Sequence, residues 1–175
     1  MRLLAPALAL TLALLPAAAH PALPTGQAAP DFSTSGALAG RPFQFSLRRA
    51  LRNGPVVLYF YPRSFTEGCT LEAKAFADAM PEFRKAGARV VGMSADNLDT
   101  LKKFSTEACR NKFPVATATP QTIKAYDVVL KQKPELTDRT SYVIDRHGKI
   151  VMVHSDLNWK DHVAKTLAAV QALKR

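Results

Sequence analysis

Pro62, Thr66 and Cys69 are three residues that could do chemistry together, and their spacing is Pro-x-x-x-Thr-x-x-Cys. They follow the apolar run at 56–61, which has the composition of a buried strand, and they precede a stretch with helical periodicity. We therefore expect Cys69 at a helix N-terminus. Unpaired backbone N–H groups and the positive end of the helix dipole favour a thiolate there, and a thiolate is the form that attacks a peroxide oxygen.

Thr66 and Pro62 would form a small anion-stabilising pocket around Cys69. The Thr66 hydroxyl could accept a hydrogen bond from a backbone N–H of the first helical turn and still reach a substrate oxygen. Pro62 would shield the sulfur from bulk water and fix the loop. Chemically, the pocket needs one further cation.

Cys109 is the second of the two cysteines, and the pair is separated by 40 residues. That spacing excludes the Cys-x-x-Cys motif of disulfide exchangers. Three roles for Cys109 stay open: a static structural disulfide with Cys69, an unrelated buried thiol beside a one-cysteine mechanism, or a thiol that reacts with Cys69 during turnover.

Other side chains point to no further chemistry. The four histidines show no ligand spacing, so we expect no metal and no cofactor. The formal net charge is +10, but the basic residues are spread out and carry no aromatic stripe, so we expect no nucleic acid. Phe65 and Phe113 could line an apolar collar for organic peroxides, or serve in the core or in a partner contact.

The elements that must position these residues alternate along the chain. We expect strands at 56–61 and 90–93, a hairpin of 141–144 with 150–153, and helices at 70–85, 96–109, 119–126 and from 161. Pro81 should kink or split the first helix. In the last helix Val163, Leu167, Val170 and Leu173 should face inward. This order implies an α/β fold with one central mixed sheet and helices on both faces.

The chain should comprise a signal peptide at 1–19, a flexible leader at 20–29 and one domain at 30–175. Met1-Arg2, an apolar run and Ala17-Ala18-Ala19 have the layout of a secretory signal that is cleaved near Ala19. The run is short and interrupted by prolines, so no stable membrane insertion is expected. The expected location is the periplasm.

The residues from Tyr61 to Glu72 resemble the peroxiredoxins, and most closely the bacterioferritin-comigratory-protein or peroxiredoxin Q subfamily. Three further stretches extend the resemblance: Ala29-Pro30-Asp31-Phe32, Ser94-Ala95-Asp96 and Arg139-Thr140-Ser141-Tyr142-Val143-Ile144-Asp145. The resemblance implies a thioredoxin-like fold and a monomer. It also implies a thiol-dependent peroxidase that reduces hydrogen peroxide or organic hydroperoxides and is regenerated by a thioredoxin-like or other thiol reductant protein.

The resemblance also assigns roles to individual residues. Thr66 would hydrogen-bond the peroxide, Cys69 would become a sulfenic acid, and Arg139 would stabilise the leaving oxygen. Glu72 would orient Arg139, and Cys109 would resolve the sulfenic acid as a disulfide.

The sequence departs from the subfamily pattern at two positions. Lys74 stands where many members carry the resolving cysteine, and Glu67 stands where proline is usual. Glu67 adds a negative charge beside the expected thiolate.

Two other functions remain as alternatives. A thiol-disulfide exchange protein on the same fold is disfavoured by the lack of Cys-x-x-Cys. A non-catalytic thioredoxin-fold binding or copper-delivery module would need a second cysteine near Cys69, and the sequence has none there.

Overall fold

A mixed β-sheet forms the centre of the computed structural model, which describes residues 22–173. Its strand order is β2-β1-β5-β4-β3-β6-β7. β3, β4 and β5 run parallel, and the other neighbours pair antiparallel. The strands are β1 Ser33–Leu38, β2 Arg41–Ser46, β3 Val56–Phe60, β4 Arg89–Ser94, β5 Val115–Thr117, β6 Thr140–Ile144 and β7 Ile150–Ser155.

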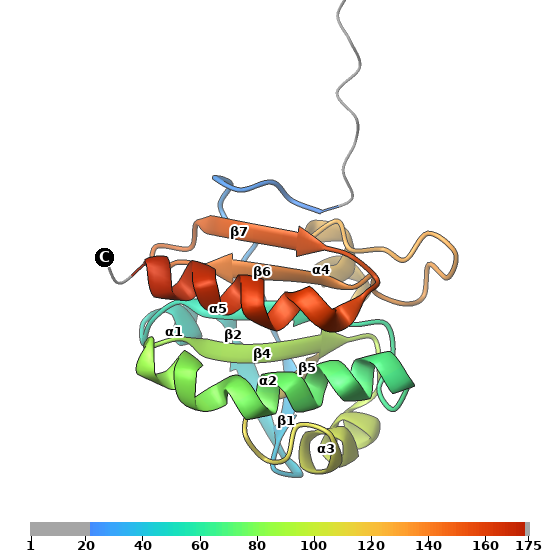
Figure 1. Cartoon of the computed structure of the whole chain (residues 1–175). Helices are drawn as coiled ribbons and strands as arrows, with labels where there is room; N and C mark the ends of the chain where they lie inside the picture. The colour runs from blue at the N-terminus through green and yellow to red at the C-terminus, as the bar shows by residue number, and fades with distance from the viewer. Residues whose placement is uncertain (1–21, 174–175) are drawn as a thin grey trace, which may run out of the picture.

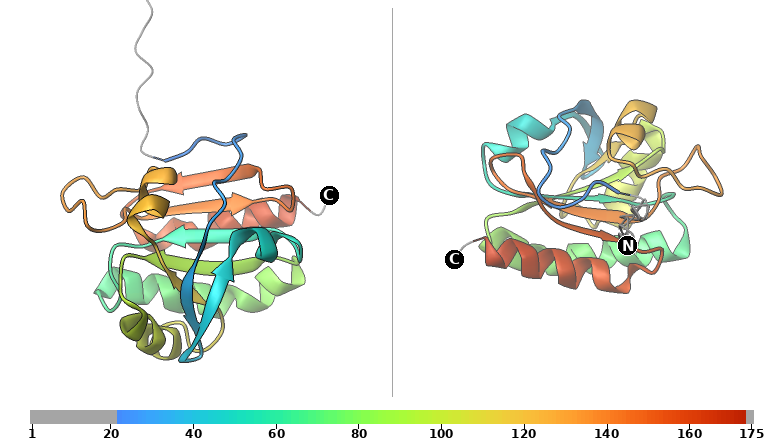
Figure 2. Two further views of the ribbon diagram at one scale, coloured as in Figure 1. Left: turned by 180° about the vertical axis from the view of Figure 1, so that it is seen from behind. Right: turned by 90° about the horizontal axis from the view of Figure 1, so that it is seen from above.

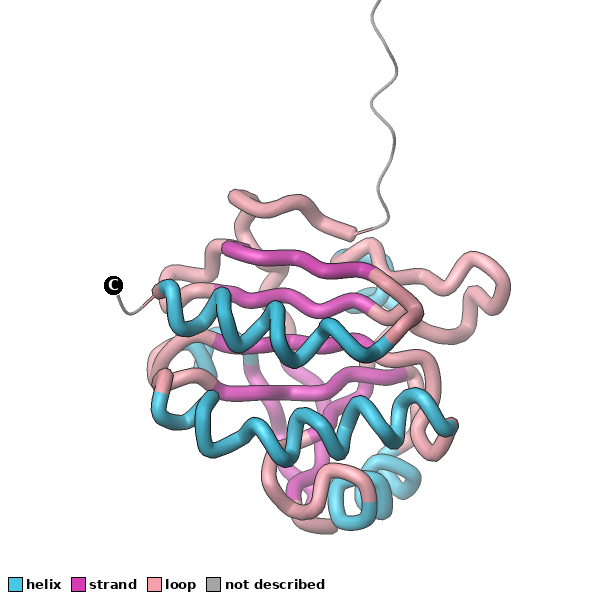
Figure 3. The backbone as a smooth tube through the Cα atoms, viewed as in Figure 1, coloured by secondary structure: helices cyan, strands magenta, loops and turns pink. Residues whose placement is uncertain are grey.

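Helices cover both faces of this sheet, as the sequence predicts. α2 and α5 lie side by side over one face (Figures 1 and 3), and α1 and α4 lie over the other, which Figure 2 shows from behind. α3 packs near β1 and β5. The bounds are α1 Leu47–Leu51, α2 Glu67–Lys85, α3 Leu98–Glu107, α4 Pro120–Ala125 and α5 His162–Ala172, with a 3₁₀ turn at Trp159–Asp161.

The continuous apolar character of β3 follows from burial on both sides. Val57 and Tyr59 lie in the core under α2 and α5, whereas Val56, Leu58 and Phe60 lie in the core on the opposite face. Successive side chains of a strand point to opposite faces, so a strand covered on both faces is apolar throughout. This strand ends where the loop that carries Pro62 and Thr66 begins.

Pro81 does not split the first long helix, contrary to expectation. α2 runs unbroken from Glu67 to Lys85, and Pro81 is exposed on it. Proline removes one backbone hydrogen bond, but Met80 and Phe83 on either side are buried and hold both parts of the helix to the core.

The leader, residues 20–29, is expected to be flexible, but backbone hydrogen bonds hold it in the part that the structure describes. Backbone hydrogen bonds join Gly26 to Ile150, at 2.8 Å, and Ala29 to Gly148, also at 2.8 Å. Residues 26–29 are therefore docked on the β6–β7 hairpin, because their backbone groups pair with it. The expected signal peptide, 1–19, lies outside the described residues.

No helix in residues 22–173 is long and apolar enough to cross a membrane.

Candidate active site

Cys69 is buried in the first turn of α2, three residues into the helix. The N–H groups of Glu67, Gly68 and Cys69 have no acceptor within the helix, because the first intrahelical bond runs from Thr70 N–H to Thr66 C=O at 2.9 Å. The sulfur thus lies beside the positive end of a 19-residue helix, as expected.

The loop before Cys69 is fixed by hydrogen bonds to the segment after β4. Asp96 accepts from the Ser64 N–H at 2.7 Å and from the Ser94 hydroxyl at 2.8 Å. Phe65 adopts a left-handed conformation with φ of 65°, which is strained for a side chain of this kind. Its exposed ring meets Phe104 of α3 edge-on, so the loop is held against a second helix as well.

Arg139 supplies the cation that the pocket lacks. Thr140 opposes Phe60 in the β3–β6 pairing, so Arg139 lies at the end of the sheet where β3 gives way to the Cys69 loop. Its Nη2 is 3.4 Å from Cys69 Sγ, and its Nη1 donates to Glu72 Oε2. The structure therefore brings Cys69, Glu72 and Arg139 together from two elements 70 residues apart in sequence.

The guanidinium has a third fixed contact and a close neighbour. Arg139 Nε donates to the Leu157 carbonyl at 2.8 Å. A Cβ on Gly68 would lie 3.3 Å from Arg139 Nη2 and 3.7 Å from Trp159 Cδ1, so glycine at this position leaves the room that the guanidinium occupies. With all three nitrogens placed, Arg139 cannot swing away from the sulfur without breaking several contacts.

Burial dominates the electrostatics of Glu72. It raises the pKa of this carboxyl to about 8, although Arg139 lowers it. Burial alone would lower the pKa of Arg139, but the charges of Glu72 and Cys69 raise it above its ordinary value. Arg139 is therefore a permanent cation beside the sulfur, whereas Glu72 can exchange a proton near neutral pH.

Ser141 and His162 are buried members of this site that the sequence did not reveal. Ser141 lies in β6, two residues after Arg139, and its hydroxyl is 2.8 Å from His162 Nδ1. His162 Nε2 is 2.9 Å from the Asp156 carbonyl, so Nε2 carries the proton and Nδ1 accepts from Ser141.

His162 also faces the carboxyl that holds Arg139. Its Nδ1 is 3.8 Å from Glu72 Oε1, a buried oxygen for which residues 22–173 provide no hydrogen-bond partner. Burial lowers the pKa of His162 to about 4, so the imidazole is neutral at physiological pH. The spacing Arg139-x-Ser141 was the available signal for Ser141, but nothing local to His162 marked it.

Thr66 is the N-cap residue of α2, but its hydroxyl does not accept a hydrogen bond from the first turn as expected. The hydroxyl instead donates to the Arg63 carbonyl at 3.1 Å. Its lone pairs remain available to a substrate O–H. Pro62 directly follows Tyr61 in the same loop and is half-buried.

Cys109 is a free thiol that lies beyond the end of α3. It follows α3 by two residues, is fully buried, and its N–H donates to the Phe104 carbonyl at 3.1 Å. Burial raises its pKa well above the ordinary value, so the thiol stays protonated in this conformation. The structure contains no bond between Cys69 and Cys109, and both sulfurs are buried.

Of the two aromatic residues considered for an apolar collar, Phe113 is a core residue whose ring meets Tyr59 and Phe76. Phe65 is exposed at the edge of the Cys69 loop. In the described part of the chain, no group of three or more metal-ligating side chains is assembled.

The buried neutral His162 predicts a specific loss of stability in acid. Its folded pKa is below the ordinary 6.5, so the unfolded chain takes up a proton first as the pH falls from about 6.5 to 4. The His162 contribution costs the fold up to about 3 kcal/mol over that window, whereas the raised pKa of Glu72 contributes in the opposite direction. Chemical denaturation at several pH values should therefore show that the free energy of unfolding of His162→Gln rises relative to that of the wild type as the pH falls from 6.5 to 4.

The exposed His147 provides the matched control for this prediction. His147→Gln should keep the acid dependence of the wild type. If His162→Gln loses stability between pH 6.5 and 4 as steeply as the wild type does, His162 is not the group responsible.

Comparison with known proteins finds a family model and individual relatives that are similar to this chain. The model of the AhpC/TSA family matches residues 25–153. Chloroplastic peroxiredoxin Q of Sedum lineare is 35% identical over 139 residues, which make up 77% of this chain and 72% of that protein.

Two solved structures are similar both in sequence and in fold. Peroxidoxin BcpB from Mycobacterium tuberculosis is 34% identical with a TM-score of 0.74, and the match covers 86% of this chain and 98% of that one. Peroxiredoxin Q from Xanthomonas campestris is 29% identical with a TM-score of 0.69, and the match covers 81% and 91%.

Proposed function

Since the chain belongs to the AhpC/TSA family and the relatives similar to it are named peroxiredoxins and peroxidoxins, we propose that it is a thiol peroxidase with Cys69 as its nucleophile. The observation that carries the proposal is the 3.4 Å contact between Cys69 Sγ and Arg139 Nη2 at the N-terminus of α2. A buried thiol beside a fixed guanidinium and unpaired N–H groups suits the attack of a thiolate on an O–O bond.

In the first step, the Cys69 thiolate attacks the terminal peroxide oxygen. An S–O bond forms, the O–O bond breaks, and the electron pair leaves with the second oxygen. This oxygen takes up a proton from the solvent, which received one when the Cys69 thiol ionised, and departs as water or an alcohol. Arg139 Nη2 and the free N–H groups of the first turn stabilise the charge on the departing oxygen. The Thr66 hydroxyl accepts a hydrogen bond from the peroxide O–H, since its own proton is donated to the Arg63 carbonyl.

Three neighbours keep Arg139 in position for this step. Glu72 pairs with Nη1 and the Leu157 carbonyl accepts from Nε, so Nη2 is left to face the sulfur. His162 and Ser141 are joined by a hydrogen bond, and His162 faces the second oxygen of Glu72. These residues act through Arg139 and do not touch the peroxide.

In the second step, Cys109 attacks the sulfur of the Cys69 sulfenic acid, water leaves, and a disulfide forms. A thioredoxin-like dithiol then reduces this disulfide. Because both sulfurs are buried and unbonded in the reduced fold, the end of α3 and the start of α2 must open for the bond to form. Helix ends open more cheaply than helix centres.

Peroxide consumption driven by dithiothreitol tests the proposed function directly. We expect catalytic loss of hydrogen peroxide or an organic hydroperoxide, with enzyme turnover. A protein that reduces disulfides of other proteins but does not consume peroxide would instead be a thiol-disulfide exchange protein.

The resolving role of Cys109 predicts what its replacement does. One equivalent of peroxide should consume both thiols of the wild type and leave a monomeric Cys69–Cys109 disulfide. Cys109→Ser should stop at the sulfenic acid and proceed to sulfinic acid when more peroxide is added, because no thiol intercepts the first product. Mass measurement of the intact protein and its peptides distinguishes these states.

A Cys109 thiol that stays free in the wild type after peroxide treatment would argue against resolution by this residue. A Cys69–Cys109 bond that mild dithiols reduce only in denaturant would equally count against it, since it would mark a structural disulfide.

We further propose that the protein is exported to the periplasm after cleavage near Ala19, and that it acts as a monomer. The layout of residues 1–19 supports export. Mass measurement of the protein recovered from a periplasmic extract would test the cleavage site, and its sedimentation would test the monomer.

A further inference from the structure

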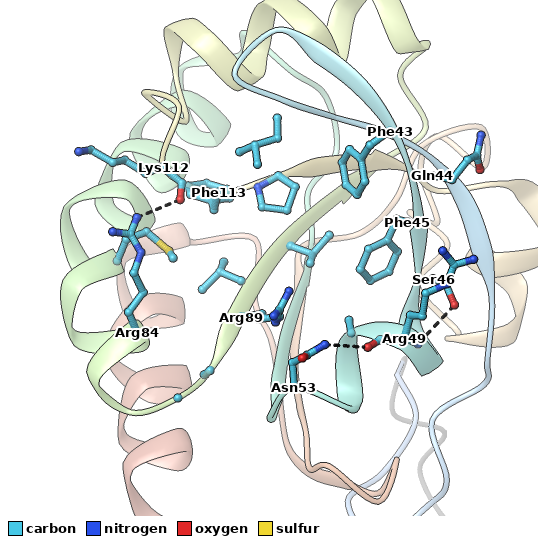
Figure 4. Close-up of a pocket in the computed structure, with 18 residues that line it drawn as sticks. Phe43, Gln44, Phe45, Ser46, Arg49, Asn53, Arg84, Arg89, Lys112 and Phe113 are labelled. Carbon is cyan, nitrogen blue, oxygen red and sulfur yellow. Dashed lines mark hydrogen bonds between the residues drawn. The ribbon is translucent and has the colours of Figure 1, made fainter.

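A cavity of about 630 Å³ lies at the opposite end of the sheet from Cys69. It borders the first residues of β4, and Arg89 there pairs with Val56 at the start of β3, whereas Cys69 follows the end of β3. Figure 4 shows β2, β4 and α2 around it. Its volume is in the range of small-molecule binding sites.

The cavity exists because the sheet is open on one side of β4. β5 has three residues and pairs with β4 only from Gly92 onward. Residues 89–91 of β4 therefore have no strand beside them on the β5 side. The cavity fills this gap between β4 and the side chains of β2.

The interior of the cavity is apolar and its surroundings are cationic. Its accessible apolar lining includes Leu38, Phe43 and Pro114, and buried apolar residues lie beneath: Phe45, Met80, Val90 and Phe113 among them. Four basic residues complete it, and no aspartate or glutamate lines the cavity; the four are Arg49, Arg84, Arg89 and Lys112. A ligand that matches both features has a hydrocarbon body and an anionic group.

These cations are not neutralised by the protein. Within residues 22–173, none of the four forms a salt bridge, whereas the exposed Arg48 pairs with Asp31 and Arg110 pairs with Asp78. Arg84 donates to the Lys112 carbonyl at 3.2 Å, which joins α2 to the far wall of the cavity. The cavity thus keeps unpaired positive charge above a buried apolar surface.

We propose that this cavity binds an amphiphilic carboxylate, a hydrocarbon chain that ends in a single carboxylate. The chain packs against Leu38, Phe43 and Pro114, and the carboxylate pairs with Arg89 at the mouth. A nucleotide suits the cavity less well, because its polar base and several phosphates would face the apolar lining.

The cavity also borders the segment that follows Cys109. Lys112 N–H donates to the Cys109 carbonyl at 2.9 Å, and Phe113 is both buried and part of the lining. If Cys109 moves to resolve Cys69, which rests on the proposed function, this wall moves with it. A ligand that contacts this wall then binds the reduced fold more tightly than the disulfide form, and by linkage it shifts the equilibrium away from the disulfide form. The existence of the site does not depend on this linkage.

Calorimetric titration of the reduced protein with dodecanoate, below its micelle concentration, tests the site. We expect saturable binding of one molecule and no comparable binding of dodecylamine or acetate. Arg89→Glu should weaken the affinity by about tenfold or more, because it replaces the pairing cation with a repelling charge. Arg41→Glu makes the same change of charge on an exposed residue outside the lining, and it should bind like the wild type.

Three results would overturn the site: no saturable binding, equal binding of the amine, or equal loss of affinity in Arg89→Glu and Arg41→Glu. Phe43→Ala tests the apolar part separately, and its melting temperature reports whether it folds. Titration of the peroxide-oxidised protein tests the linkage. Weaker binding than to the reduced protein supports it, and equal affinity overturns the linkage while leaving the site and the peroxidase function in place.

Discussion

Replacement of Cys69 by serine is expected to abolish peroxide turnover completely. The chain has one other cysteine, Cys109, which is buried and whose raised pKa keeps it protonated in the reduced fold. A serine hydroxyl is not ionised at the helix N-terminus and does not attack a peroxide oxygen. Peroxide consumption with dithiothreitol as reductant should fall to the rate of the buffer alone.

Cys109→Ser is the matched control for this experiment, because it makes the same atomic change at the other thiol. It should retain the first reaction with peroxide while losing disulfide formation. Turnover above background in Cys69→Ser would remove Cys69 from the role of nucleophile.

Arg139→Ala should slow the reaction of Cys69 with peroxide by about 10²- to 10³-fold, the scale of a lost oxyanion donor. Nη2 donates to the sulfur at 3.4 Å, and a methyl group cannot stabilise the departing oxygen. Arg139→Lys should recover little, since a single ammonium cannot face Cys69, Glu72 and the Leu157 carbonyl at once. Stopped-flow measurement of the second-order rate constant checks both variants.

The loss of Arg139 also leaves the buried Glu72 carboxyl without its hydrogen-bond partner, which destabilises the fold. The double variant Arg139→Ala with Glu72→Gln replaces this carboxyl by a neutral amide and keeps the rate measurement on a folded protein. Arg48→Ala, which removes an exposed salt bridge to Asp31, is the control for arginine loss as such. A wild-type rate constant in Arg139→Ala would show that Arg139 is purely structural.

The parts of the site that could be predicted from the sequence depend on local signals. The apolar run at 56–61, the turn into a helix at Cys69 and the β6–β7 hairpin each leave a pattern within about ten residues. The structure confirms these elements. Arg139 is identified only through the family motif, because its contact with Cys69 depends on the pairing of β3 with β6.

The missed elements lack such patterns. β1 consists mainly of small residues, Ser33, Ser35, Gly36 and Ala37 among them, and β5 has only three residues, so neither forms a recognisable apolar strand. Both are stabilised by pairing with distant strands.

The prediction of which residues of the last helix face inward is wrong at Leu173, for a related reason. Leu173 is 41% exposed, whereas His162 and Thr166 are fully buried. An apolar pattern cannot identify these two polar residues as core. His162 is buried because Ser141 and the Asp156 carbonyl satisfy its ring, and Thr166 because its hydroxyl donates to the His162 carbonyl at 2.7 Å.

The most direct test of Cys69 as the peroxide-reactive thiol is a single turnover followed by peptide mass analysis. Reduced Cys109→Ser protein is mixed with one equivalent of hydrogen peroxide and then with a reagent that traps sulfenic acids. We predict the trapped adduct on the peptide that contains Cys69, formed much faster than free cysteine reacts under the same conditions. An unmodified Cys69 thiol after all the peroxide has been consumed, or a reaction no faster than that of free cysteine, would contradict the account.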